Sequence, residues 1–295
     1  EFVSANPTGP LHIGHCRGAI FGDVLSNLLK FNGNKVTKEF YINDYGKQID
    51  DFSKSIYLRL KEIKFNTKFP SDETLYPGSY IIDISKKILK DEPDINLENF
   101  NKIKNKLKKQ GLKYSMDSIK LDLKNLGITH DNFVSETTLV KNKSVEKVIK
   151  ILKKKNLIEE GYLDPPKGED NKNWKKVKRL IFKSSLFGDD ANRALTKNDN
   201  TWTYFANDLA YHSNKVSRKY DYLINILGAD HAGYIKRISS AVNALSKKEN
   251  ILICKVCQLV KLIKNGQPYK MSKRKGDFIE IKDVLNEVGK DSLRF

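Results

Sequence analysis

The chain has 295 residues and a formal net charge of +18, from 54 Lys and Arg against 36 Asp and Glu. This length can bury a large core with more than one structural unit. The charge favours an anionic partner, above all a nucleic acid, over lysines that merely solvate the surface. There is no run of 18 apolar residues and no signal-peptide pattern, so we expect no membrane span, and three cysteines favour a reducing, cytoplasmic compartment.

The first 63 residues predict strands and helices in alternation. An apolar strand over 1–5 and a turn precede a helix over 13–31, whose apolar side chains recur at helical spacing. A second strand over 36–42 is followed by a helix that contains residues 49–63. This order is typical of the opening of a parallel α/β sheet.

The pattern changes between residues 64 and 176, where the chain is rich in lysine and mostly helical, with Pro and Gly between the helices. The spacing predicts helices over 80–90, 98–126 and 145–157. We interpret this part as an insertion in the sheet. Alternation of apolar and polar residues returns at 177–184.

The sheet pattern then resumes. We expect a strand over 202–205, a helix over 206–218 and an apolar strand over 222–227, followed by a helix up to residue 245. A long apolar strand over 251–263 comes next. Asn265-Gly266 then predicts a hairpin turn.

The sequence PLHIGH (residues 10–15) lies between the first predicted strand and the first predicted helix. His12 and His15 share one face of the helix start, where backbone N–H groups and the helix dipole favour an anion. Two imidazoles with a glycine between them suit a nucleotide phosphate, although the chain has no Walker-type loop. By itself such a pair is more often a surface pair or a metal site.

Two further motifs carry charged side chains. Lys270 and Lys273 lie in a basic loop that can close over a polyphosphate, although such a loop alone is usually only solvated. Asp230 and His231 follow a predicted strand, at the carboxyl end where doubly wound sheets bind ligands. They can also simply cap the next helix.

Cys254 and Cys257 have a spacing that could suggest zinc, but neither a second pair nor a nearby histidine accompanies them. In a strand this spacing points the two thiols to opposite faces. We therefore expect no structural zinc and no other metal site.

The motifs PLHIGH (10–15) and KMSK (270–273) resemble the two signatures of class I aminoacyl-tRNA synthetases. Longer blocks, in the same order along the chain, resemble arginyl-tRNA synthetase of the bacterial type. They are EFVSANPTGP (1–10), YIND (41–44), YPGSY (76–80), FGDD (187–190), YFANDLAYH (204–212), GADH (228–231) and MSKRKGDF (271–278).

The resemblance implies an α/β fold: the Rossmann-like parallel sheet of class I synthetases, split by a mostly helical insertion. It implies a first half of the nucleotide-binding fold (1–63), a lysine-rich connective insertion (64–176), a second half (177–264), and a KMSK-type loop with the start of a helical region (265–295). The family's tRNA-elbow and anticodon-binding domains are missing, and both ends interrupt predicted elements. We therefore expect a catalytic core from a longer protein.

The resemblance also assigns roles to individual residues. Tyr204 and Asp208 fall on one helix face, and together they can match a planar guanidinium, which a lone carboxylate would not distinguish from lysine. Without the family, an interface tyrosine and a helix-surface acid would be favoured. The implied catalytic residues are His12, His15, Lys270 and Lys273; the ATP contacts are Gly14, Asp230, His231, Met271 and Ser272; the arginine contacts are Glu1, Ser4, Asn6, Tyr204 and Asp208.

The implied enzyme is an arginine–tRNA ligase. The ionised arginine carboxylate attacks the α-phosphorus of ATP, which requires positioning and charge stabilisation but no general base. The arginyl-adenylate then passes arginine to the 2′-OH of the terminal adenosine of tRNA(Arg). ATP with Mg2+ is a substrate, L-arginine and tRNA(Arg) are the other partners, and we expect a monomer. Two alternatives stay open: a nucleotidylyltransferase, which shares the histidine signature, and a catalytically silent, synthetase-like RNA-binding paralogue.

Overall fold

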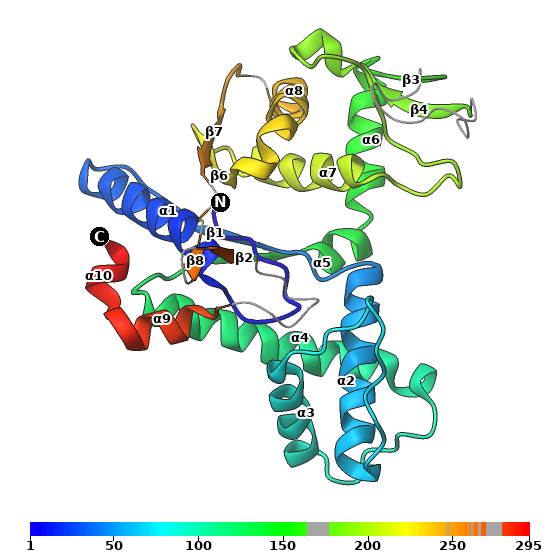
Figure 1. The fold of residues 1–295 in the computed structure, drawn as a ribbon. Helices are drawn as coiled ribbons and strands as arrows, with labels where there is room; N and C mark the ends of the chain where they lie inside the picture. The colour runs from blue at the N-terminus through cyan, green and yellow to red at the C-terminus, as the bar shows by residue number, and fades with distance from the viewer. Residues whose placement is uncertain (164–176, 247, 259, 261, 265–266, 270–278) are drawn as a thin grey trace. The chain divides into compact units, whose positions relative to one another are not determined.

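The computed structural model of the chain describes residues 1–163, 177–246, 248–258, 260, 262–264, 267–269 and 279–295 (Figure 1). These residues form two compact units. Unit 1 combines Glu1–Ser135 with Cys257–Phe295, and unit 2 is the continuous segment Glu136–Val256. Among the described helices, none is both long and apolar enough to cross a membrane.

Unit 1 contains a parallel pair of strands. β1 (Glu39–Ile42) and β2 (Asn132–Ser135) pair residue by residue along their whole length. The parallel direction is the one that the α/β pattern predicts, since parallel strands need a long crossover connection. The sequence pattern does not predict β2, because its four residues are all partly buried and show neither alternation nor an apolar run.

Three helices of unit 1 form the crossover between β1 and β2, and they pack against one another (Figure 1). Phe52, Ile56 and Leu60 are fully buried on one face of α2, as the apolar spacing predicts. Gly111 of α4 allows a close approach, because a Cβ atom there would lie 2.4 Å from Ile56 Cδ1. The bounds are α2 Lys47–Phe65, α3 Ser79–Asp91 and α4 Phe100–Asn125.

The first helix, α1 (Ile13–Phe31), spans the predicted residues and is held by buried charges. Asp23 accepts hydrogen bonds from Lys38 Nζ at 2.6 Å and from Arg294 Nη2 at 2.7 Å. Burial alone would raise the pKa of Asp23, but these hydrogen bonds outweigh it and hold the pKa below its ordinary value. The helix is thereby fixed to the residue before β1 and to the end of α10. The remaining elements of unit 1 are β8 Leu262–Lys264, β9 Gln267–Tyr269, α9 Ile281–Val288 and α10 Lys290–Arg294.

Unit 2 has its own apolar core, formed by three helices around its strands. Val148, Leu209 and Val242, one from each helix, are fully buried. β3, β4 and β5 form an antiparallel sheet, and β6 pairs with β7. The bounds are α5 Glu136–Lys141, α6 Ser144–Lys154, β3 Ile158–Gly161, β4 Arg179–Phe182, the 3-10 helix η2 Ser184–Phe187, β5 Arg193–Ala194, α7 Tyr204–Ser217, β6 Leu223–Gly228, the 3-10 helix η3 Ala229–Tyr234, α8 Ile235–Leu245 and β7 Leu252–Cys257.

Two predicted strands are wrong. The segment 1–5 leaves the extended conformation at Val3 and Ser4, whose φ angles of 68° and 40° lie in the left-handed region. At 202–205, the Thr203 side chain accepts a hydrogen bond from the backbone N–H of Ala206 and caps a helix that begins at Tyr204. In both places apolar and aromatic residues imitate a strand pattern.

The long strand predicted over 251–263 is divided. β7 ends at Cys257, and β8 begins at Leu262. β8 pairs antiparallel with β9 through Lys264 and Gln267, as the predicted hairpin requires. The turn residues 265–266 themselves lie outside the described residues.

Candidate active site

The histidine pair lies at the amino end of α1, and its hydrogen bonding defines a tautomer. The ring centroids of His12 and His15 are 3.9 Å apart, and the backbone N–H of His12 donates to His15 Nδ1 at 3.2 Å. Because Nδ1 is the acceptor, the neutral His15 ring carries its proton on Nε2. That Nε2–H is a donor of the kind that a phosphate oxygen accepts.

Three backbone hydrogen bonds hold the histidine motif in place. The N–H of Leu11 donates to the buried carboxylate of Asp122 at 3.2 Å, and its carbonyl accepts from the N–H of Ile281 at 3.1 Å. Ile13 N–H donates to the carbonyl of Ile279 at 3.1 Å. The backbone N–H of Ile13, in the first turn of α1, is therefore already bonded within the protein.

The same bonds anchor the residues that follow the basic motif. Lys270, Met271, Ser272 and Lys273 lie outside the described residues, as does the rest of 270–278. The chain is described again from Ile279, which binds the histidine motif.

The first residues of the chain form a small hydrogen-bonded group on β1. Ser4 Oγ donates to Glu1 Oε1 at 3.0 Å and accepts from the N–H of Tyr41 at 3.0 Å. The structure thus brings two predicted arginine contacts together, while Asn6 is exposed. Buried Phe2 fixes this segment against α1, since a Cβ atom at Gly22 would lie 2.4 Å from its ring.

His130 lies beside the same segment, among aromatic rings. Its ring centroid is 4.3 Å from that of Phe2, and Phe40 and Phe133 are the next neighbours. Burial lowers the pKa of His130 to about 4, because the apolar surroundings disfavour the charged ring. The imidazole is therefore neutral near pH 7.

In unit 2, the predicted pair Tyr204 and Asp208 lies on the first turns of α7, four residues apart. Tyr204 is 80% exposed, with Lys197 Nζ 5.5 Å from its ring centroid. Asp208 is partly buried, and its Oδ2 accepts a hydrogen bond from the hydroxyl of Tyr234 at 2.6 Å. The pair therefore combines an exposed aromatic side chain with a carboxylate in a fixed orientation.

Asp230 and His231 begin η3, directly after β6, where the sequence places them. Both are exposed, with His231 Nε2 3.5 Å from Asp230 Oδ2. Tyr234 is the last residue of the same short helix. The structure thus connects the predicted ATP contacts to the predicted arginine contact Asp208 through a residue that sequence reasoning did not single out.

A buried polar group lies beneath α7, and sequence reasoning missed it. His212 Nδ1 bonds to the carbonyl of Asp208 at 2.9 Å, and its Nε2 bonds to Asn225 Nδ2 at 3.1 Å. Lys215 Nζ donates to Asn225 Oδ1 at 2.9 Å, and all three of these side chains are buried. The available signal was an asparagine in the middle of an apolar strand, which requires buried partners.

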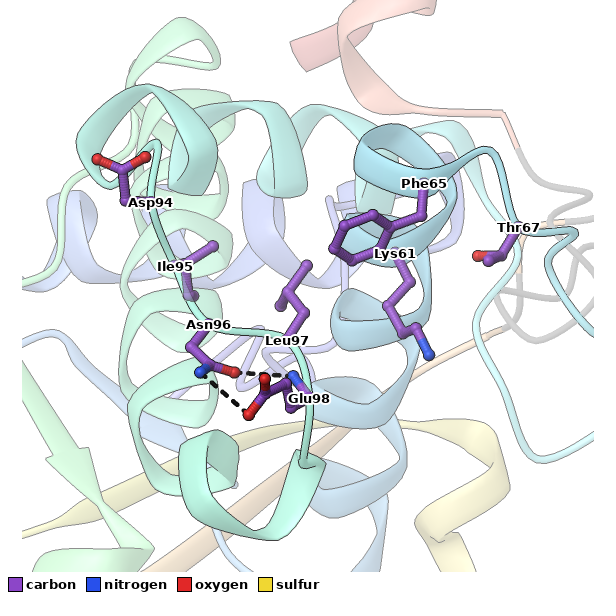
Figure 2. A pocket seen from close by; sticks show the side chains of 8 residues that line it. All are labelled: Lys61, Phe65, Thr67, Asp94, Ile95, Asn96, Leu97 and Glu98. Atoms are coloured by element: carbon purple, nitrogen blue, oxygen red, sulfur yellow. Dashed lines mark hydrogen bonds between the residues drawn. The ribbon is translucent and has the colours of Figure 1, made fainter.

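A hollow of about 540 Å³ lies elsewhere in unit 1, at the end of α2. Figure 2 shows that Asn96 and Glu98 bond to each other on one side of it, where Glu98 N–H donates to Asn96 Oδ1 at 2.8 Å. It contains none of the predicted site residues. Its lining consists of Lys61, Phe65, Thr67, Asp94, Ile95, Asn96, Leu97 and Glu98.

Among the residues that the structure describes, no group of three or more His, Cys, Asp or Glu side chains is placed to hold a metal ion. Cys254 and Cys257 are partly buried thiols that form no disulfide. Burial raises the pKa of the Cys257 thiol, which makes it a poorer metal ligand and nucleophile.

The whole chain, residues 1–295, matches the family described as class I tRNA synthetases (R), catalytic domain. The chain belongs to this family, which confirms the resemblance and the class I fold. An arginine–tRNA ligase of Pelagibacter ubique (strain HTCC1062) is 57% identical to it over 296 residues, and one of Wolbachia pipientis wMel is 49% identical. Both matches cover 100% of this chain and 51% of the relative, so the chain spans about half the length of these curated relatives.

Two solved structures resemble this chain in fold. A structure from Campylobacter jejuni assigned to the arginyl-tRNA synthetases is 36% identical, with a TM-score of 0.83 over 99% of this chain and 60% of that one. An arginyl-tRNA synthetase of Thermus thermophilus has the same fold, with a TM-score of 0.68 at 16% identity over 99% of this chain and 55% of that one.

Proposed function

We propose that this chain contains the catalytic site of an arginine–tRNA ligase. In the first step the arginine carboxylate attacks the α-phosphorus of ATP. An oxygen–phosphorus bond forms, and pyrophosphate leaves with the electron pair of the bond that breaks. In the second step the 2′-OH of the terminal adenosine of tRNA(Arg) attacks the carbonyl carbon of the adenylate, and AMP leaves.

The observation that supports this proposal most strongly is the state of the histidine pair. His15 keeps an Nε2–H donor because its Nδ1 is occupied by the backbone of His12. A fixed donor needs no reorganisation as charge builds on the phosphate oxygens, which is the source of its catalytic effect. Lys270 and Lys273 would supply positive charge to the leaving pyrophosphate, and ATP would enter with Mg2+ bound to its phosphates.

Separate residues would contact the guanidinium and the rest of the arginine substrate. Tyr204 and Asp208 would bind the guanidinium, because a planar cation with five donors matches a carboxylate and an aromatic face. Glu1, Ser4 and Asn6 would bind the rest of the amino acid. Gly14, Asp230, His231, Met271 and Ser272 would surround the adenosine and the phosphates.

Further parts of the proposal concern the protein as a whole. We expect it to act as a cytoplasmic monomer, in a reducing compartment that suits cysteines without disulfides. The division into parts 1–63, 64–176, 177–264 and 265–295 stays a proposal about how function is distributed along the chain.

The experiment that tests the proposal is the exchange of labelled pyrophosphate into ATP by the full-length protein. We expect exchange with arginine in the presence of tRNA(Arg), and none with lysine or citrulline. The tRNA is included because members of this family generally activate arginine only with tRNA bound. Replacing its terminal adenosine by 2′-deoxyadenosine is a matched control that should block transfer while leaving exchange in place.

The alternatives give different outcomes. A nucleotidylyltransferase would exchange pyrophosphate only when its own acceptor of the nucleotidyl group is added, and this exchange would not depend on arginine or tRNA. A silent paralogue would bind tRNA without catalysing exchange. Either result would contradict the proposal.

A further inference from the structure

The carboxylate of Asp208 is bonded by a tyrosine from a different element. Tyr234, at the end of η3, donates its hydroxyl hydrogen to Asp208 Oδ2 at 2.6 Å. The tyrosine ring packs edge-on against Phe205, with centroids 6.5 Å apart, and the guanidinium of Arg237 lies 5.6 Å from its centroid. Its position is therefore fixed from two sides, which limits the orientations that the Asp208 carboxylate can adopt.

Tyr234 remains a donor throughout the physiological pH range. Burial raises its pKa, and the adjacent negative charge of Asp208 raises it further, because both disfavour a phenolate. The phenol therefore stays protonated, and its single hydrogen points to the carboxylate.

The backbone of Asp208 is restrained as well. Its carbonyl bonds to Nδ1 of the buried His212, whose other nitrogen bonds to Asn225 on β6. The side chain of Asp208 is thus held by Tyr234 of η3, and its main chain by His212 of α7, which is itself bonded to β6.

We propose that Tyr234 is a positioning residue that fixes the Asp208 carboxylate in the orientation in which it receives a guanidinium. This inference rests on the proposed arginine-binding role of Asp208. The planar guanidinium of arginine forms two parallel hydrogen bonds only with a carboxylate that lies in the guanidinium plane. The ammonium group of lysine binds as a point charge in many orientations. Fixing the carboxylate therefore favours arginine over lysine.

The test compares Tyr234→Phe with the wild type in the full-length protein. The change removes one hydroxyl and keeps the ring that packs on Phe205. Tyr222→Phe is the matched control, because Tyr222 is an exposed tyrosine of the same unit, 66% accessible. Steady-state pyrophosphate exchange with tRNA(Arg) gives the KM for arginine and the KM for ATP separately.

We expect Tyr234→Phe to raise the KM for arginine about tenfold or more, the size of a lost hydrogen bond to a charged group. The KM for ATP and the unfolding temperature should stay near the wild-type values, the preference for arginine over lysine should fall, and Tyr222→Phe should change none of these. An unchanged KM for arginine in an active enzyme would overturn the inference. So would a parallel rise of both KM values with a lower unfolding temperature, which would indicate a structural role. Absence of arginine-dependent exchange in the wild type would instead overturn the proposed function itself.

Discussion

In the proposed site, His15 would accept the N–H of His12 at Nδ1 and donate to phosphate from Nε2, and a substitution can separate these two roles. Asparagine retains an oxygen near the position of Nδ1, which can still accept from the N–H of His12, but it lacks the Nε2–H donor. We expect His15→Asn to slow adenylate formation about 10²–10³-fold, as for loss of one preorganised donor. The unfolding temperature should hardly change.

Glutamine at the same position is the matched variant, because its amide N–H reaches near the position of Nε2. His15→Gln should therefore retain more activity than His15→Asn in single-turnover measurements. Lys273→Ala should cost a factor similar to that of His15→Asn. Near-normal rates for both His15→Asn and Lys273→Ala would argue against their assignment to phosphate.

His130 makes the stability of unit 1 dependent on pH. Its pKa is about 4 in the folded protein against about 6.5 in an unfolded chain, so the unfolded state binds the proton first as the pH falls. Stability should decrease between pH 6.5 and 4, by about 2 kcal/mol from pH 7 to pH 5. His130→Phe should remove this part of the decrease, as measured by urea unfolding at the two pH values.

An equal loss of stability in wild type and His130→Phe would show that other groups cause it. Asp23 can add to acid destabilisation only at lower pH, because its pKa lies below the ordinary value for a carboxyl and its stabilising hydrogen bonds are lost when it is protonated.

At the residue scale, the sequence motifs identify the side chains that can take part in the reaction. They do not identify the residues that hold these side chains in position. The positions of His12, His15, Asp208 and Asp230 at element ends follow from strand and helix patterns alone. Tyr234 carries no signature, because a tyrosine near a helix start is most often ordinary packing. Its role depends on a contact between elements, which a linear pattern does not contain.

At the scale of the secondary-structure elements, α1 contains two glycines, Gly18 and Gly22, that lie one helical turn apart and can be compared by the same substitution. A Cβ atom at Gly22 would collide with Phe2, whereas one at Gly18 would meet no atom within 4 Å. Gly22→Ala should displace Phe2, disturb the Glu1–Ser4 group next to it and raise the KM for arginine. Gly18→Ala should stabilise the helix by up to about 1 kcal/mol.

Both glycine variants require the same two measurements, thermal unfolding and the KM for arginine. If Gly18→Ala and Gly22→Ala have the same KM for arginine and the same unfolding temperature, the contact between α1 and residues 1–4 does not position the arginine contacts. If only Gly22→Ala raises the KM for arginine, the result would support the link between α1 and the Glu1–Ser4 group.

Long amphipathic helices are the elements that the sequence predicts best, and α1, α2 and α6 begin or end within a few residues of the expected positions. Short strands are predicted poorly. β2 is stabilised by its pairing with β1, and the segment 1–5 is bent by left-handed residues, so neither follows from its own composition.

At the scale of the whole molecule, the charge of +18 would make the proposed binding of tRNA sensitive to salt. Each phosphate neutralised by a lysine or arginine releases counterions, so log K should fall linearly with log salt. If six or more phosphates are contacted, affinity should drop about 10³-fold between about 50 and 200 mM salt. Filter binding of tRNA(Arg) measures this slope.

The control for the salt series is the KM for arginine, a small ligand with few charges, which should vary much less over the same range. Salt-insensitive binding of tRNA would mean that the lysines only solvate the surface. The sequence predicts the sign and size of this charge, but which lysines face the nucleic acid depends on tertiary structure.

The discontinuity of unit 1 has a consequence for biosynthesis. Leu11 bonds to Ile281 and Ile13 bonds to Ile279 through backbone groups, so the turn that precedes α1 stays incomplete until these later residues have been translated. Unit 2 is a single continuous segment and can fold before the last residues of unit 1 emerge. The histidine motif is thus synthesised long before residues 279 and 281, whose backbone groups complete it, and a nascent chain cut short before residue 279 would lack these bonds.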